Sequence, residues 1–210
     1  HRDLHSFPTR RSSDLDGNGG VPTAEAITVT FDGTYAEMLT GITAKKTGYD
    51  FVGWYTNATN GIKIDETVKV TANPYTVLYA QYKKSTYTVK VWPNGGTITD
   101  TANTEHTSEF DITVTYNDTY FTTIGGYKVE RAGYTFVGWY SDETAGVEIT
   151  ASTKVDVNAD DSVNYPNIYA RFKADTITVT LAGGGGTLSQ NTLEVVFAGK
   201  YVGLDEIGKT

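Results

Sequence analysis

Two closely matched segments, GYDFVGWYT at residues 48–56 and GYTFVGWYS at residues 133–141, decide how this chain folds. They lie 85 residues apart, and each is followed by one of a second matched pair, VLYAQYK at 77–83 and NIYARFK at 167–173. Self-similarity at a fixed spacing is typical of repeat proteins, in which each copy folds as one supersecondary unit. We therefore expect one small fold to occur more than once.

Further matches extend the similarity upstream of these segments. ITVTFDGTY at residues 27–35 matches ITVTYNDTY at 112–120 and, more loosely, LEVVFAGKY at 193–201. YTVKVWPNGGTI at 87–98 returns as ITVTLAGGGGTL at 177–188, so the opening of the repeat recurs as well.

These matches order the chain as three repeats, at residues 16–84, 85–174 and 175–210. Only the loop DGNGGV of the opening survives in the first copy, so we expect that copy to lack its first strand. The third copy ends before it reaches a Trp segment. The second copy is the complete one.

The first fifteen residues, HRDLHSFPTRRSSDL, do not belong to this pattern. They back-translate to an oligonucleotide that resembles a common sequencing-library adapter read in frame. We predict that residues 1–15 are an adapter-derived artefact and disordered, and we leave them out of the fold.

Each repeat shows the alternation of apolar and polar residues that marks strands buried on one face. In the second repeat, Tyr87, Val89 and Val91 alternate with Thr and Lys, and residues 112–116 repeat the pattern. No amphipathic helical pattern lasts three turns. The prediction is a mainly β (α+β) chain with at most a short helical turn between strands.

The Trp segment needs a break in this alternation, because a regular strand would place Phe51 and Trp54 on opposite faces. One extra residue flips the register of a strand, so we predict a β-bulge at Gly53 and at Gly138. Phe and Trp then share the core and supply large buried areas. The predicted structural motif comprises Gly48, Tyr49, Phe51, Gly53, Trp54 and Tyr55, and in the second copy Gly133, Tyr134, Phe136, Gly138, Trp139 and Tyr140.

Composition excludes several classes of function. The chain has 25 acidic and 17 basic side chains, a net charge of −8, three His and no Cys. An acidic surface argues against nucleic acid as a partner, and thiol chemistry and Cys-based metal sites are excluded. No apolar run reaches the roughly 18 residues of a membrane span, so we expect no membrane insertion in this part of the chain.

Taken together, the NGG turn, the G-Y-x-F-x-G-W-Y segment and the closing L-Y-A-Q-Y resemble the Listeria/Bacteroides-type bacterial repeat, also called the internalin B-repeat. The likeness covers residues 16–210. It implies small β-grasp-like (ubiquitin-like) modules in tandem within large exported proteins, typically surface-anchored adhesins. An insertion at 100–108 and ARF at 170–172 depart from the usual pattern.

Few residues suggest chemistry. Asp156, Asn158 and Asp160 have the spacing of oxygen ligands for Ca²⁺, but the glycine and the glutamate of such a loop are missing, which favours a polar loop. His106 lies in a Thr-rich and Glu-rich insertion, which favours a solvated loop residue. Trp92 is a large ring at an outward position. It either packs on the preceding repeat near Lys83 or contacts a partner.

The sequence therefore predicts a non-enzymatic stalk or spacer without cofactors, in an exported, adhesin-like protein at the bacterial cell surface or cell wall. Its partners are then only neighbouring repeats. The alternative is that the repeats themselves bind a host protein or glycan through outward aromatic residues such as Trp92.

Overall fold

Pairing between the first and last strands of a repeat organises each part of the chain. The computed structural model describes residues 11–199. These divide into two compact units, and the division does not follow the sequence strictly. The first unit runs to Thr86 and also takes in Thr115–Asn117 and Asp156–Ser162, while the rest of the described chain belongs to the second unit.

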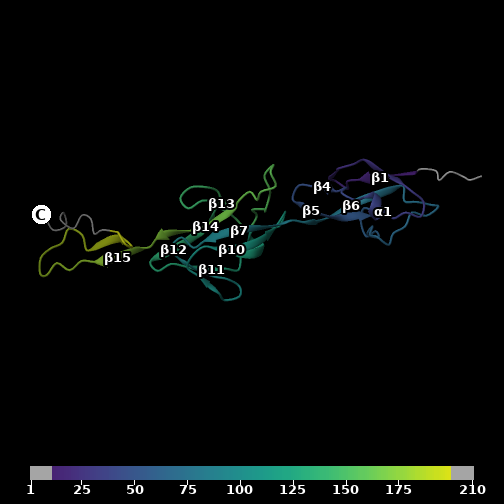
Figure 1. Cartoon of the computed structure of the whole chain (residues 1–210). Coiled ribbons are helices and arrows are strands. Elements are labelled where there is room, and N and C mark those ends of the chain that lie inside the picture. Colours follow the sequence, from purple (N-terminus) through teal and green to yellow (C-terminus); the bar gives the residue numbers. More distant parts are fainter. Residues whose placement is uncertain (1–10, 200–210) are drawn as a thin grey trace, which may run out of the picture. The chain divides into compact units, whose positions relative to one another are not determined.

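The second unit is built on a five-stranded sheet with the order β10-β7-β14-β12-β13 (Figure 1). Its strands are β7 (Thr86–Trp92), β10 (Phe110–Thr115), β12 (Tyr134–Tyr140), β13 (Glu148–Ile149) and β14 (Asn167–Ala174). The central strands β7 and β14 are parallel, with Val91 opposite Ile168. A small second sheet, β11-β8-β9, and a single helical turn complete the repeat; they are β8 (Thr97–Thr99), β9 (Glu105–His106), β11 (Lys128–Glu130) and α2 (Phe121–Ile124).

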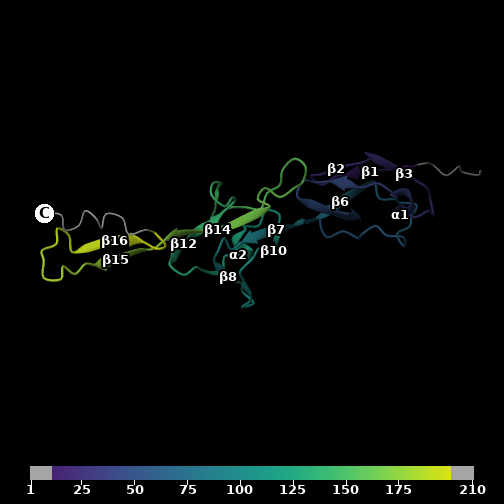
Figure 2. The same ribbon diagram turned by 60° about the vertical axis from the view of Figure 1, so that its left-hand side comes forward.

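The first unit repeats this plan with a four-stranded sheet of order β3-β1-β6-β5 (Figure 2). Its strands are β1 (Arg11–Asp16), β3 (Ala26–Val29), β5 (Tyr49–Tyr55) and β6 (Val77–Lys84). Here too the first and last strands are parallel, with Leu15 opposite Leu78. The unit also holds a short pair of strands and one helical turn: β2 (Val21–Pro22), β4 (Ala44–Lys45) and α1 (Tyr35–Met38).

The first repeat has an opening strand, and the prediction that it lacks one is corrected by β1. Residues 11–15 are ordered in this strand, whereas residues 1–10 of the segment predicted to be disordered lie outside the described residues. Alternation explains why the segment fits, because Ser13 and Leu15 point inward and are buried while their neighbours are exposed. Ser13 Oγ donates a hydrogen bond to the carbonyl oxygen of Tyr75 at 2.5 Å. The adapter origin of residues 1–15 stays a prediction.

Strands of the predicted third repeat form a two-stranded ladder, β15 (Thr176–Thr180) and β16 (Thr192–Val196), within the second unit (Figure 2). The chain thus has two compact units where the sequence predicts three repeats, because the strands of the third repeat belong to the second unit. Residues 200–210 of the third repeat lie outside the described residues.

The prediction of a mainly β fold is confirmed. Both repeats place the second strand beside the first and the Trp strand beside the last, with the first and last strands parallel at the centre. The helix between the second and third strands is one turn of four residues in each copy, so the full β-grasp description stays a prediction.

Each unit has its own core with a Trp and a Tyr at corresponding positions. Trp54 and Trp139 are buried, and Nε1 of Trp54 donates to the carbonyl oxygen of Ile42 at 3.0 Å. Tyr35 and Tyr120 are fully buried, and the hydroxyl of Tyr120 donates to Oδ1 of Asn164 at 2.7 Å. Buried rings with satisfied polar tips add area without leaving an unpaired group in the core.

Two β-bulges confirm the predicted break in alternation. In the first unit the register shifts between Phe51 and Gly53, and in the second it shifts between Phe136 and Gly138. The shift lets each Phe ring pack edge-on against its Trp, at centroid distances of 5.5 and 5.4 Å. Both glycines have positive φ, 147° and 157°, which a side chain would disfavour.

Replacing Trp139 by Ala is expected to lower the free energy of unfolding by about 3 to 5 kcal/mol, because the side chain is 4% exposed and its loss opens a cavity. Chemical denaturation followed by circular dichroism measures the change. Val137→Ala is the matched control, since Val137 lies on the same strand with 51% exposure and should change stability by under about 0.5 kcal/mol. Equal effects of the two substitutions would contradict the assigned core.

Candidate functional site

The outer face of the second unit carries a row of aromatic rings. Trp92, Tyr169 and Tyr140 lie directly opposite one another on the neighbouring strands β7, β14 and β12. The Trp92 and Tyr169 rings are stacked, 5.6 Å apart with 11° between their planes. We call Trp92, Tyr169 and Tyr140 the aromatic row.

Polar contacts hold the aromatic row in place. Nε1 of Trp92 donates to Oδ1 of Asn167 at 3.0 Å. The Arg171 guanidinium lies 4.0 Å from the centre of the Tyr140 ring and donates to the carbonyl oxygen of Asp142 at 2.8 Å. Backbone N–H groups of Ala145 and Thr144 lower the pKa of the Asp142 carboxyl, and the nearby charge of Arg171 adds to this. The row is therefore a fixed surface of partly exposed rings beside a cation.

Trp92 packs against Tyr169 of its own repeat, and the predicted contact with the preceding repeat near Lys83 stays a prediction. The physical reason for the packing on Tyr169 is cross-strand register, since Tyr169 stands directly opposite Trp92 and offers a ring of matching orientation. The corresponding positions of the first unit are Asp16, Tyr79 and Tyr55. The complete row is thus a feature of the second repeat. Whether Trp92 contacts a partner stays a prediction.

A recess of about 320 Å³ lies in the first unit, and Lys46 is one of the residues that line it. Nζ of Lys46 lies 4.8 Å from the centre of the Tyr49 ring and 5.2 Å from that of Tyr82, and it donates to the carbonyl oxygen of Asn18 at 3.3 Å. The Tyr82 hydroxyl donates to the carbonyl oxygen of Gly17 at 2.7 Å. Burial raises the pKa of Tyr82, and the negative charge of Asp16 raises it further.

The same arrangement recurs in the second unit with an arginine. The guanidinium carbon of Arg131 lies 4.0 Å from the Tyr134 ring centre and 5.5 Å from that of Phe172. Arg131 Nη1 donates to the carbonyl oxygen of Asn94 at 3.1 Å. A Cβ on Gly95 would stand 3.3 Å from that guanidinium, so the NGG turn keeps room for the cation. We call this cation, its two rings and the Asn carbonyl the cation clamp, and we interpret it as a structural feature of each repeat.

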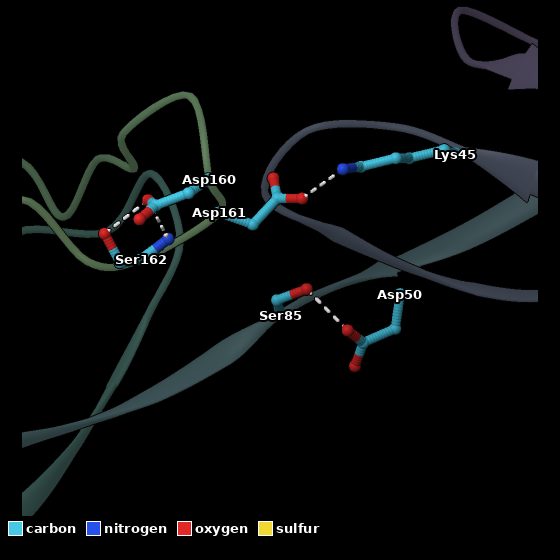
Figure 3. A network of polar contacts seen from close by, with 6 residues as sticks. All are labelled: Lys45, Asp50, Ser85, Asp160, Asp161 and Ser162. Carbon is cyan, nitrogen blue, oxygen red and sulfur yellow. Dashed lines mark hydrogen bonds and ion pairs between the residues drawn. The ribbon is translucent and has the colours of Figure 1, made fainter.

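The predicted cation loop forms hydrogen bonds within itself (Figure 3). Oδ1 of Asp160 accepts from the hydroxyl of Ser162 at 2.6 Å and from its backbone N–H at 3.0 Å, and these bonds lower the pKa of the Asp160 carboxyl. Asn158 Nδ2 donates to the Ser162 hydroxyl, while Oδ1 of Asp156 accepts from the N–H of Val157.

The acidic residue next to this loop is bound to a lysine. Oδ2 of Asp161 lies 2.7 Å from Nζ of Lys45 (Figure 3). Within residues 11–199, no three His, Asp or Glu side chains gather closely enough to hold a metal ion. The hydrogen bonds from Ser162 to Asp160 shape the turn of this loop.

His106 is in a strand and packed against a ring, which differs from the predicted solvated loop. It lies in β9, and its ring stacks on Phe110 at 3.7 Å, with Nε2 3.1 Å from Oδ2 of Asp100. Asp100 Oδ1 accepts from the N–H groups of Thr104 and Ala102 at 2.9 and 2.8 Å. The hydrogen bond from Thr104 and that from His106 lower the pKa of the Asp100 carboxyl. Together these bonds cap the turn between β8 and β9.

Sequence reasoning identified the rings of the Trp segment and Trp92, but it missed Lys46, Arg131, Tyr169 and Arg171. A signal for Lys46 and Arg131 was present, because a basic residue stands three positions before the first Tyr of each Trp segment. No comparable sequence signal marked Tyr169 and Arg171.

Comparison with protein families finds two matches to the Listeria–Bacteroides repeat domain, over residues 15–81 and 87–163. Together they cover more than half of the chain and fall on the first two predicted repeats. No solved structure matches the chain significantly.

Three curated proteins are similar in sequence to this chain. A putative Gly-rich membrane protein of Evansella cellulosilytica is 26% identical over 84% of this chain and 18% of its own length. A putative membrane protein of the same organism is 27% identical over 81% of the chain and 22% of its own length. Internalin H of Listeria monocytogenes is 30% identical over 64% of the chain and 24% of its own length. The chain thus spans less than a quarter of the length of each of these three relatives.

Within residues 11–199, no helix has the length and apolar character needed to cross a membrane. The two helices are single turns of four residues.

Replacing Asp100 by Asn is expected to remove a pH-dependent part of the stability. The pKa of this carboxyl is lower in the folded protein than 3.8, the usual value of an aspartate. Its stabilising contribution is therefore present above pH 3.8 and is lost as the pH falls through the folded pKa. The difference in unfolding free energy between the two proteins should therefore shrink between about pH 6 and about pH 3. Urea denaturation at several pH values measures it. A difference that stays constant with pH would contradict the assigned hydrogen bonds.

Proposed function

The chain belongs to the Listeria–Bacteroides repeat domain family, and from this premise we propose that it is a non-catalytic repeat region of an exported bacterial surface protein. In this role the repeats act as a stalk or spacer that holds another part of the protein away from the cell wall. Similarity to internalin H and to two proteins named as membrane proteins supports placement at the cell surface.

The observation that carries the proposal is that two copies fold around separate cores of the same design. Each core has its own Trp, its own buried Tyr and its own parallel pair of central strands. A module that completes its own core can be added or removed without loss of its neighbour's fold, which suits a spacer whose length varies by number of copies.

Structural use of the charged side chains supports the non-catalytic part of the proposal. Lys46 and Arg131 are engaged in cation clamps, while Asp100, Asp142 and Asp160 accept hydrogen bonds that shape turns. Catalytic groups instead have to converge on a substrate position. The acidic balance of the chain, with a net charge of −8, suits a soluble exposed segment.

The spacer role is tested by displaying the chain on a Gram-positive cell between a wall anchor and a terminal epitope. We expect an antibody to reach the epitope several times more often than when the same anchor and epitope are joined directly. The double variant Trp54→Ala and Trp139→Ala is the matched control, because it keeps the length of the chain but removes both cores. Flow cytometry measures antibody binding. Equal binding with and without the chain would argue against a spacer.

A second candidate function is glycan binding by the aromatic row of the second unit. Its support is the in-register stack of Trp92 and Tyr169, extended by Tyr140 and bordered by Arg171. Flat, partly exposed rings suit the apolar faces of sugar rings, and a guanidinium next to them can donate hydrogen bonds to hydroxyl or carboxyl groups.

Trp92→Ala tests this candidate. We expect the intact chain to bind glycans on an array and the variant to lose about tenfold or more in affinity, with unfolding unchanged within about 1 kcal/mol. Tyr79→Ala is the matched control, since Tyr79 is the equivalent of Tyr169 in the first unit, where Asp16 replaces the Trp. Loss of binding in the control, or no binding by the intact chain, would rule out the aromatic row as the site.

A further inference from the structure

Within the first unit, Tyr116 packs on the Gly48–Tyr49 pair that begins the Trp segment. Tyr116 belongs to the second repeat of the sequence but to the first compact unit of the structure. The ring of Tyr116 packs edge-on against Tyr49, with centroids 5.3 Å apart and 70° between the planes. Gly48 has a φ of 75°, and a Cβ built on it would stand 2.5 Å from atoms of the Tyr116 ring. The glycine is therefore required by the ring as well as by the backbone conformation.

The second unit contains the same arrangement. Phe197 packs edge-on against Tyr134, with centroids 5.5 Å apart and 75° between the planes. Gly133 has a φ of 74°, and a Cβ on it would stand 2.4 Å from the Phe197 ring. We call each Gly-Tyr pair the corner and each ring placed on it the corner ring.

Hydrogen bonds around the corner also recur. In the first unit the N–H of Ser85 donates to the carbonyl oxygen of Gly48 at 3.0 Å, and the N–H of Tyr116 donates to that of Ser85 at 3.0 Å. In the second unit the N–H of Asp175 donates to the carbonyl oxygen of Gly133 at 3.0 Å, and the N–H of Phe197 donates to the backbone carbonyl oxygen of Asp175 at 2.7 Å.

The side chains beside these bonds exchange roles between the two corners. The hydroxyl of Ser85 donates to Oδ1 of Asp50 at 2.5 Å (Figure 3), whereas the hydroxyl of Thr135 donates to Oδ1 of Asp175 at 2.6 Å. The hydroxyl and the carboxylate have changed sides, and the hydrogen bond is kept. Both corners therefore have the same hydroxyl-to-carboxylate hydrogen bond, with the donor and the acceptor exchanged between the two positions.

The first repeat carries a corner ring with no corner beneath it among residues 11–199. Phe31 is the counterpart of Tyr116 and Phe197 in the matched segments FDGTY, YNDTY and FAGKY. The residue after each ring has positive φ: 63° at Asp32, 61° at Asn117 and 53° at Ala198. Yet Phe31 is 64% exposed, compared with 37% for Phe197, and no ring in residues 11–199 packs on it.

We propose that Phe31 is a docking residue for the Gly-Tyr corner of another repeat of this family, placed directly ahead of β1. The local backbone already has the conformation found at the two occupied corners, so the ring is held ready for its partner. The occupant has to supply a glycine, because any Cβ at that position would overlap the ring. An aromatic residue follows the glycine at both occupied corners and packs edge-on against the corner ring.

This inference depends on the repeat organisation and not on the spacer role. If Phe31 binds nothing, two self-contained repeats still remain between an anchor and a distal part. If the spacer role fails, the corner contacts remain as described.

The test is a duplicated chain in which residues 11–175 are added before residue 10 of the chain, in place of residues 1–9. Asp175 of the added copy then occupies the position that Ser85 has in the existing joint. The added copy carries Phe31→Leu, so that the Phe31 peptide comes from the downstream copy. Hydroxyl-radical labelling with mass spectrometry measures the exposure of that ring. Ile62, which is 61% exposed in the same unit, is the internal reference.

We expect labelling of Phe31 to fall roughly twofold on duplication, toward the 37% exposure of Phe197, while Ile62 is unchanged. Gly133→Val in the added copy should restore the original labelling, because the ring can no longer sit on the corner. Tyr134→Ala is the second variant, used with labelling of Trp139 to check that the added copy is folded.

Three results would overturn the proposal. The first is unchanged labelling of Phe31 on duplication. The second is a fall that persists in both corner variants when Trp139 stays protected. The third is a fall in the unduplicated chain that grows with protein concentration, since this would identify a second copy of the chain as the occupant.

Discussion

Parallel pairing of the first and last strands is the constraint on which each repeat depends. In the second unit it places Val91 beside Ile168, both fully buried, and in the first it places Leu15 beside Leu78. These two strands are the centre of the sheet, so the Trp strand and the second strand can only add at its edges. Closing a repeat therefore requires its two ends to meet, which makes each copy a self-contained unit.

The parallel pairing of the first and last strands explains where the features that the two copies share are located. A strand order with both ends central brings the NGG turn after the first strand close to the last strand and the Trp strand. The cation clamp forms there, with Lys46 or Arg131 between two rings and an Asn carbonyl. The same Tyr of each clamp also receives the corner ring. One aromatic residue in each unit thus contacts both the cation of the clamp and the corner ring.

The two faces of the sheet differ in how much they vary between the two copies. The inward face packs into the core around the Trp. The Gly-Tyr corner packs against the corner ring. What differs between the copies is the outward face, where Trp92 and Arg171 in the second repeat replace Asp16 and Gln81 of the first. The Trp at the centre of the core is therefore shared by the two copies, whereas these outward positions differ.

The sequence by itself determined the mainly β fold, the repeat pattern and the two bulges, because alternation and its interruption are local properties of a strand. Tertiary structure decided the rest. It placed residues 11–16 as an opening strand, since a backbone can pair wherever small or apolar side chains alternate inward. It also gave Trp92 its partner Tyr169 and seated Phe197 on Gly133. These contacts join residues more than 60 positions apart, and their geometry follows from strand register and ring packing that no local pattern encodes.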